Sequence, residues 1–236
     1  MTVLADYINA IENMAPGSYP WSGVDLEAKE SLAVTMGLKA HARHRPRVVV
    51  EDESGTGAFD YLISALAKWS EGFSAIRQIE YPVDDTDEAA DLLEDGDWEI
   101  YEKPAGKVIR FLEVKPATGE SFRVTYTAPH DFSLTGSACT VAAFDDEAVQ
   151  ALAAANFCKM LAVYYSQNQD STIAADSVDH KSKAQEFAAR AKMLAQAYYD
   201  HMGIKEGQPK PASLTQDQDV VYPWGTDRLT HPRRER

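Results

Sequence analysis

Apolar residues near the N-terminus recur at the spacing of an amphipathic helix. The first four such positions are Leu4, Tyr7, Ile8 and Ile11. They predict a short helix that ends before residues 15–17, which combine Pro and Gly. A second helix is expected to begin after Ser22 or Asp25, either of which is a good N-cap, and to run toward His44. It ends before Pro46, because the residue preceding a proline is pushed out of the α region.

From residue 47 the pattern changes to short apolar runs separated by turn residues. Five runs predict strands: residues 48–50, 73–81, 98–101, 107–114 and 121–128. The last three are joined by residues 103–106 and 115–119, which have hairpin length and contain Pro and Gly. Apolar and polar side chains alternate along residues 121–128, so one face of this strand is expected to be buried and the other solvated. We therefore predict an antiparallel meander.

Two long helical patterns follow the predicted meander. Apolar residues, many of them alanine, recur with a helical period in residues 145–167 and 178–202, and Gly203 suits the position after a helix end. Residues 204–236 contain four prolines and too few apolar residues to fold alone, so we predict an extended C-terminal tail.

These elements together predict an α+β fold. A helical domain, made of N-terminal helices in residues 1–45 and a helix pair in residues 143–203, is interrupted by an antiparallel β-rich module in residues 46–135. The extended tail of residues 204–236 completes the chain.

Composition then limits the class of protein. The chain has 236 residues, of which 44% are hydrophobic and 25% charged, as in ordinary globular proteins. Its apolar stretches are far shorter than the roughly 20 residues needed to cross a bilayer, and no export signal is visible at the N-terminus. The 37 acidic residues exceed the 23 basic residues by 14. Such a charge disfavours general nucleic-acid binding and fits a protein without a membrane partner.

The charge is unevenly distributed. Residues 83–97 hold eight acids and no base, whereas the last ten residues hold four arginines. The acidic run lacks the alternating ligands and closing glutamate of an EF-hand, so we interpret it as a solvated loop. Cys139 and Cys158 lie in apolar surroundings without zinc-site spacing, which indicates buried reduced thiols and a reducing cytosol.

Other motifs that could carry chemistry are incomplete. Gly55 and Gly57 lack the continuation of a phosphate-binding loop and are interpreted as a turn. Ser137 is not in a nucleophile elbow, and the pair of His41 and His44 has no identifiable third zinc ligand. We therefore expect no metal, no cofactor and no catalytic residue.

One enzymatic alternative remains. Glu113 and Lys115 stand two residues apart at a predicted strand end, with Asp95 or Asp97 upstream. A carboxylate that holds metal and a lysine that supports the attacking water are the parts of a magnesium-dependent nuclease half-site. A stand-alone soluble binding module is a third possibility.

Two stretches of the sequence resemble a known family. Residues 41–52 (HARHRPRVVVED) with residues 55–61 (GTGAFDY), and residues 176–188 (DSVDHKSKAQEFA), are similar to head-completion proteins of tailed bacteriophages. These are the adaptor or connector proteins of the neck, which sit beneath the portal. The similarity covers most of residues 25–203, although the β-rich module departs from simpler adaptors, which are mostly helical.

The resemblance implies a structural virion protein rather than an enzyme. Such adaptors form a ring, commonly dodecameric, that extends the portal channel and docks the next neck or tail component. The implied partners are further copies of the chain, the portal protein, a neck or tail protein, and genomic DNA that passes without specific binding. The protein would be made in the bacterial host cytoplasm and located in the virion neck, where an acidic channel wall would repel DNA phosphates.

The resemblance also suggests where the contacts lie. The helix pair would build the ring, with a subunit interface at Phe157, Tyr164, Tyr165, Phe187 and Tyr198. These aromatic residues can equally serve the core of one chain. The portal-binding tail is expected to use the following residues: Val220, Val221, Tyr222, Pro223, Trp224, Arg228, Arg233, Arg234 and Arg236.

Overall fold

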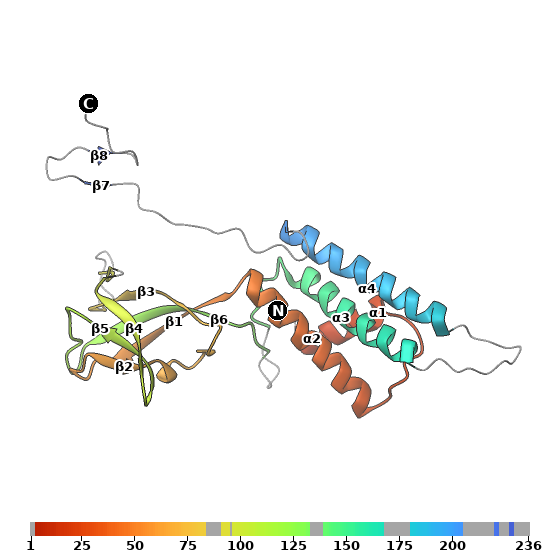
Figure 1. Cartoon of the computed structure of the whole chain (residues 1–236), viewed down its shortest axis with the longest axis horizontal. Helices are drawn as coiled ribbons and strands as arrows, with labels where there is room; N and C mark the ends of the chain where they lie inside the picture. The colour runs from red at the N-terminus through yellow and green to blue at the C-terminus, as the bar shows by residue number, and fades with distance from the viewer. Residues whose placement is uncertain are drawn as a thin grey trace, which may run out of the picture.

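Two separate hydrophobic cores divide the chain into a helical domain and a β module (Figure 1). The structure is a computed structural model. It describes residues 3–83, 91–94, 96–132, 139–167, 180–204, 220–221 and 227–228. The mixed α+β class predicted from the sequence is confirmed.

The helical domain contains four helices: α1 (Leu4–Met14), α2 (Val24–His44), α3 (Asp146–Gln167) and α4 (His180–Met202). Each was predicted from the period of its apolar residues. The start of α2 differs from the prediction, because its N-cap is Gly23 and neither Ser22 nor Asp25. Gly23 has φ of 55°, a left-handed conformation that glycine adopts without the strain of a side chain.

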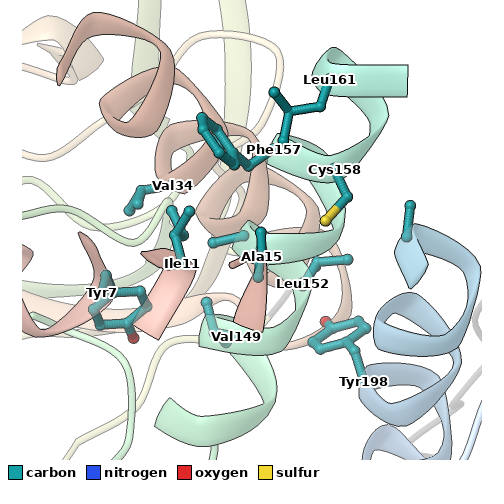
Figure 2. Close-up of a cluster of buried hydrophobic side chains, with 14 of the residues drawn as sticks. Tyr7, Ile11, Ala15, Val34, Val149, Leu152, Phe157, Cys158, Leu161 and Tyr198 are labelled. Atoms are coloured by element: carbon teal, nitrogen blue, oxygen red, sulfur yellow. The ribbon is translucent and has the colours of Figure 1, made fainter. Parts of the chain in front are cut away.

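The centre of this domain is α3, which is buried on nearly all sides (Figure 2). It lies between α2 and α4, and α1 packs against it as well (Figure 1). Small side chains allow this close packing. At the tightest point a Cβ added to Gly37 of α2 would lie 3.3 Å from the backbone nitrogen of Ala153. A central helix therefore needs alanines in its middle rather than one apolar stripe.

The β module contains six strands and one short 3₁₀ helix. In chain order they are β1 (Arg47–Ser54), β2 (Asp60–Leu62), η1 (Ile63–Ala65), β3 (Ile76–Glu80), β4 (Trp98–Lys103), β5 (Gly106–Phe111) and β6 (Ser121–Ala128). They form two antiparallel sheets with the orders β1-β6-β3 and β2-β5-β4. The sheets share one core, in which the Phe111 and Phe122 rings meet edge to face at 5.2 Å.

The predicted meander is therefore only partly correct. β4 and β5 form a hairpin, but β5 and β6 lie in different sheets. Both edges of β6 are occupied, since β1 pairs along its whole length and β3 pairs with the other edge. Residues 112–120 instead carry the chain from one sheet to the other.

This crossing segment is held by the turn at residues 55–57. The Gly55 amide donates to the Glu120 carbonyl at 2.7 Å, and the Gly57 amide donates to the Pro116 carbonyl at 2.8 Å. A Cβ on Gly55 would lie 2.3 Å from the Ala117 carbonyl oxygen. The two glycines lie in the connection between β1 and β2, and their amides bind protein carbonyls.

The predicted extended tail lies mostly outside the described residues. Within it, β7 (Val220–Val221) and β8 (Asp227–Arg228) pair as an antiparallel ladder. Across the described ranges, no helix has the length and apolar character that a membrane span requires.

The close approach of α2 and α3 makes a testable prediction. Gly37→Val would place two methyl groups against the Ala153 backbone, so we expect the free energy of unfolding to fall by about 1–3 kcal/mol. Chemical denaturation monitored by circular dichroism measures this loss. Ala28→Val, on the exposed face of the same helix, is the control and should change stability by only a few tenths of a kcal/mol. Equal losses in the two variants would contradict the tight packing at Gly37.

Candidate functional site

The junction between the helical domain and the β module is built around the carboxylate of Asp145. Asp145 directly precedes α3, and its side chain is only 2% exposed. Arg45 Nη1 donates to both carboxylate oxygens at 2.7 Å, and His201 Nε2 donates to Oδ1 at 2.8 Å. Arg45 follows the end of α2, and His201 lies in the last turn of α4. One carboxylate thus ties the ends of three helices together.

Hydrogen bonding keeps this carboxylate charged. Burial by itself raises the pKa of Asp145, but the hydrogen bonds from His201 and Arg45 outweigh burial and hold the pKa below its usual value. The group is therefore ionised at neutral pH. Removing one of its donors would leave a buried charge poorly compensated.

His41 lies beside the same carboxylate as a neutral core residue. Its ring is 1% exposed, and its Nε2 lies 3.9 Å from Asp145 Oδ2. Its Nδ1 is 3.2 Å from the hydroxyl of Tyr198. Burial, followed by repulsion from His130, lowers the pKa of His41 to about 4. The ring is neutral at pH 7 and joins α2 to α4 through the Tyr198 hydroxyl.

His130 extends the cluster into the connection between β6 and α3. Its Nε2 donates to the Arg45 carbonyl at 2.7 Å, and its Nδ1 lies 3.2 Å from the Thr140 hydroxyl oxygen. The His130 and His41 ring centres are 5.1 Å apart. The chain passes between the two bodies after α2 and again after β6, and both crossings meet here. The cluster therefore ties together the two connections between the helical domain and the β module.

Sequence reasoning did not identify Asp145, Arg45 or His130. An acid before an alanine-rich helix reads as an N-cap, and its Arg45 partner is 100 residues away. His41 and His44 were considered as zinc ligands. In the part of the chain that the structure describes, no group of three or more His, Cys, Asp or Glu residues is placed to hold a metal.

The helical domain leaves two unlike apolar faces open. On α2, Val24 is 81% exposed, and Leu32 and Met36 are about half exposed. On the far side of α3, Met193 is 65% exposed and Val163 about half exposed. The second face includes a groove of about 320 Å³ between α3 and α4. Its lining consists of Lys159, Ala162, Val163, Ala188, Ala191, Lys192 and Ala195. We call these the α2 face and the α3–α4 groove.

Four of the five aromatic residues predicted at a subunit interface lie inside the core of the single chain. They are Phe157, Tyr165, Phe187 and Tyr198. Tyr165 and Phe187 stack with ring centres 5.7 Å apart, and Tyr164 is half-buried and packs edge to face on Trp21. The subunit-interface role of these aromatic residues stays a prediction. Among the described residues, exposed apolar side chains of α2 and α3 lie instead on the α2 face and along the α3–α4 groove.

Of the predicted portal-binding residues, Val220 and Val221 lie in β7 and Arg228 lies in β8. The other six fall outside the described residues: Tyr222, Pro223, Trp224, Arg233, Arg234 and Arg236. Their role as a portal-binding segment stays a prediction.

The structure does not build the nuclease half-site as the sequence pattern suggested. β5 ends at Phe111, so Glu113 and Lys115 stand in the crossing segment and not on one strand face. Both side chains are exposed, and Lys115 Nζ lies over the Phe59 ring at 4.9 Å. Asp97 uses its carboxylate to accept from the Glu94 amide at 2.9 Å. Asp95 lies outside the described residues.

The two predicted buried thiols are both free cysteines. Cys158 is fully buried, which raises its pKa to about 11, whereas Cys139 is partly buried. Burial also raises the pKa of Cys139. Both groups are protonated thiols at neutral pH.

Comparisons with known proteins give weak similarities. No protein-family model and no curated protein matches the chain. It is similar to a chain in a structure described as the virion of a native gene transfer agent (GTA) particle, with 13% identity and a TM-score of 0.29, covering 79% of this chain and 92% of that one. A chain from the neck of an empty GTA particle gives 12% identity and a TM-score of 0.28, covering 77% and 87%. Similarity at this level does not establish a common fold.

The buried neutral His41 predicts acid sensitivity. In the unfolded chain the His41 pKa is near 6.5, and in the folded chain it is about 4. Between these values His41 binds more protons in the unfolded state than in the folded state. The contribution of its neutral form to the free energy of unfolding is therefore complete above pH 6.5 and is lost as the pH falls toward 4. The loss attributable to this residue is about 3 kcal/mol. Thermal unfolding of wild type and His41→Gln between pH 7 and pH 4 measures it.

We expect the His41→Gln variant to show a flatter dependence of stability on pH across this window. His44→Gln is the control, because His44 is only half-buried on the same helix. Parallel pH profiles for wild type and His41→Gln would contradict the neutral buried state of His41.

Proposed function

We propose that this chain is a structural protein of a tailed-phage-like particle. It acts as a head-to-tail adaptor that forms a ring beneath the portal, extends the DNA channel and docks the next neck or tail component. The observation that carries the ring is the pair of unlike apolar faces on opposite sides of α3. The resemblance of residues 41–61 and 176–188 to head-completion proteins supports the location.

Two unlike faces favour a head-to-tail assembly. A two-fold dimer uses one self-complementary patch and would leave the second face open. When the α2 face of one copy meets the α3–α4 groove of the next, every copy uses both faces. Such heterologous contacts close into a ring if the rotation between neighbours allows it.

The charge of the chain suits a channel through which DNA moves. The net charge of −14 opposes retention of a polyanion. Portal attachment is assigned to residues 204–236, which follow α4 and contain the arginine-rich end of the chain. The order of elements thus separates a ring-forming helical domain from a portal-binding segment.

The α3–α4 groove gives a direct test of ring formation. Val163→Glu puts a charge on an exposed apolar position in the lining of this groove. We expect the chain to fold but to enter particles at about a tenth or less of the wild-type amount. Quantitative mass spectrometry of purified particles, together with imaging of the neck, measures this. Gln196→Glu, an exposed position on α4 outside the groove lining, is the matched control. Undiminished incorporation of the Val163→Glu protein would rule out the heterologous contact.

Truncation tests the portal-binding tail. A chain that ends after Gly203 retains all four helices and both sheets of the β module, so its circular dichroism and thermal unfolding should be close to those of the full chain. We expect it to lose binding to purified portal rings in a pull-down assay. Portal binding equal to that of the full chain would remove the tail assignment while leaving the ring proposal in place.

A further inference from the structure

A cleft of about 570 Å³ lies where the helical domain meets the β module. Three bases line it: Lys39 on α2, Arg47 at the start of β1, and Lys68 after η1. Among the described residues these cations form no ion pair, and the one acid in the lining is Asp131. The cleft is therefore a basic site in a chain whose net charge is strongly negative.

The cleft also has an apolar wall. Leu38 is buried at its base, and Trp69 and Phe132 are half-buried along its sides. A ligand that fits must carry negative charge and at least one apolar group. Duplex DNA does not meet these conditions, because a double helix is too wide for a cavity of this volume and offers phosphates but no apolar side chain. An acidic protein segment with an exposed apolar residue does meet them.

The chain itself displays such a segment at residues 91–94. Asp91 and Glu94 are exposed, and between them Leu92 is about half exposed. The backbone here is already fixed against the sheet: the Leu93 amide donates to the Ile79 carbonyl at 2.9 Å, and the Tyr81 amide donates to the Asp91 carbonyl at 3.0 Å. A segment held in this way loses little conformational freedom on binding.

This segment cannot enter the cleft of its own chain. Leu92 bridges to Glu80, which pairs with Arg123, whereas Arg47 in the cleft pairs with Ala128. Arg123 and Ala128 are five residues apart on β6, which is about 17 Å along the strand. In addition, β3 and β1 lie on opposite edges of β6. The occupant must therefore come from another molecule.

We propose that the cleft binds residues 91–94 of a second copy of this chain. Leu92 packs against Trp69 and Phe132, and Asp91 and Glu94 pair with Lys39 and Lys68. The inference rests on the proposed ring, and names one of its subunit contacts. The two partners of this contact lie on different elements: the cleft is lined by α2 and by the segment after η1, whereas residues 91–94 bridge to β3.

The test uses the full chain and a fluorescein-labelled peptide with the sequence of residues 83–97. We expect fluorescence anisotropy to detect binding despite the like net charges of peptide and protein, and rising salt to weaken it. The double variant Lys39→Glu with Lys68→Glu should lose about tenfold or more in affinity. The variant Lys115→Glu with Lys183→Glu makes the same change in net charge outside both the cleft and the α3–α4 groove and should bind like wild type.

A charge swap makes the result specific. A peptide with Asp91→Lys and Glu94→Lys should bind the Lys39→Glu, Lys68→Glu protein better than it binds wild type. Circular dichroism confirms that each variant is folded. The inference is overturned if the native peptide shows no binding up to about 1 mM, if a scrambled peptide binds equally well, or if the Lys115→Glu, Lys183→Glu variant loses the same affinity.

The particle measurement separates this inference from the proposed function. If the chain is present in the neck but the peptide does not bind, the cleft contact fails and the adaptor role stands. If the peptide binds specifically but the chain is absent from particles, the self-association stands and the adaptor role fails.

Discussion

The buried charge of Asp145 constrains the relative positions of the helix ends that meet at this residue. An ionised carboxylate that is almost fully removed from water is stable only when donors surround it. Those donors come from the end of α2 and the last turn of α4, so the helices cannot slide along α3 without losing them. Arg45 also leads into β1, and its carbonyl accepts from His130 in the connection after β6, so both connections to the β module lie beside this carboxylate.

The helical domain depends on small side chains in its central helix. Ala153 of α3 faces Gly37 of α2 so closely that neither position has room for a larger residue. This packing places α2 and α4 on opposite sides of α3 and buries the large aromatic rings within one chain. Exposed apolar side chains remain on the α2 face and along the α3–α4 groove, and the difference between these two surfaces is the basis of the proposed head-to-tail ring.

Acidic and basic surfaces likewise lie at different places on the molecule. The acidic segment at residues 91–94 is fixed to the edge of one sheet, whereas the basic cleft lies at the junction with the helical domain. Opposite charges that are kept apart within one chain are available to meet between chains. A net negative protein can in this way attract its own copies at a local site while its overall field opposes binding of DNA.

The four helices could be predicted from the sequence, because a helix depends on neighbours three and four residues away and the apolar period records them directly. Most strands were also visible, but their partners were not: β5 and β6 follow each other in the chain yet belong to different sheets, since β1 and β3 occupy both edges of β6.

The aromatic residues of α3 and α4 show the same helical period whether they serve a core or an interface, and only the packing of α3 assigned Phe157 and Tyr198 to the core. The junction was hidden for a similar reason, because Asp145 and Arg45 meet across 100 residues. Local periodicity therefore determined the elements, and long-range contacts, which depend on burial and hydrogen bonding of distant groups, decided the sheet order, the junction and the surfaces left for partners.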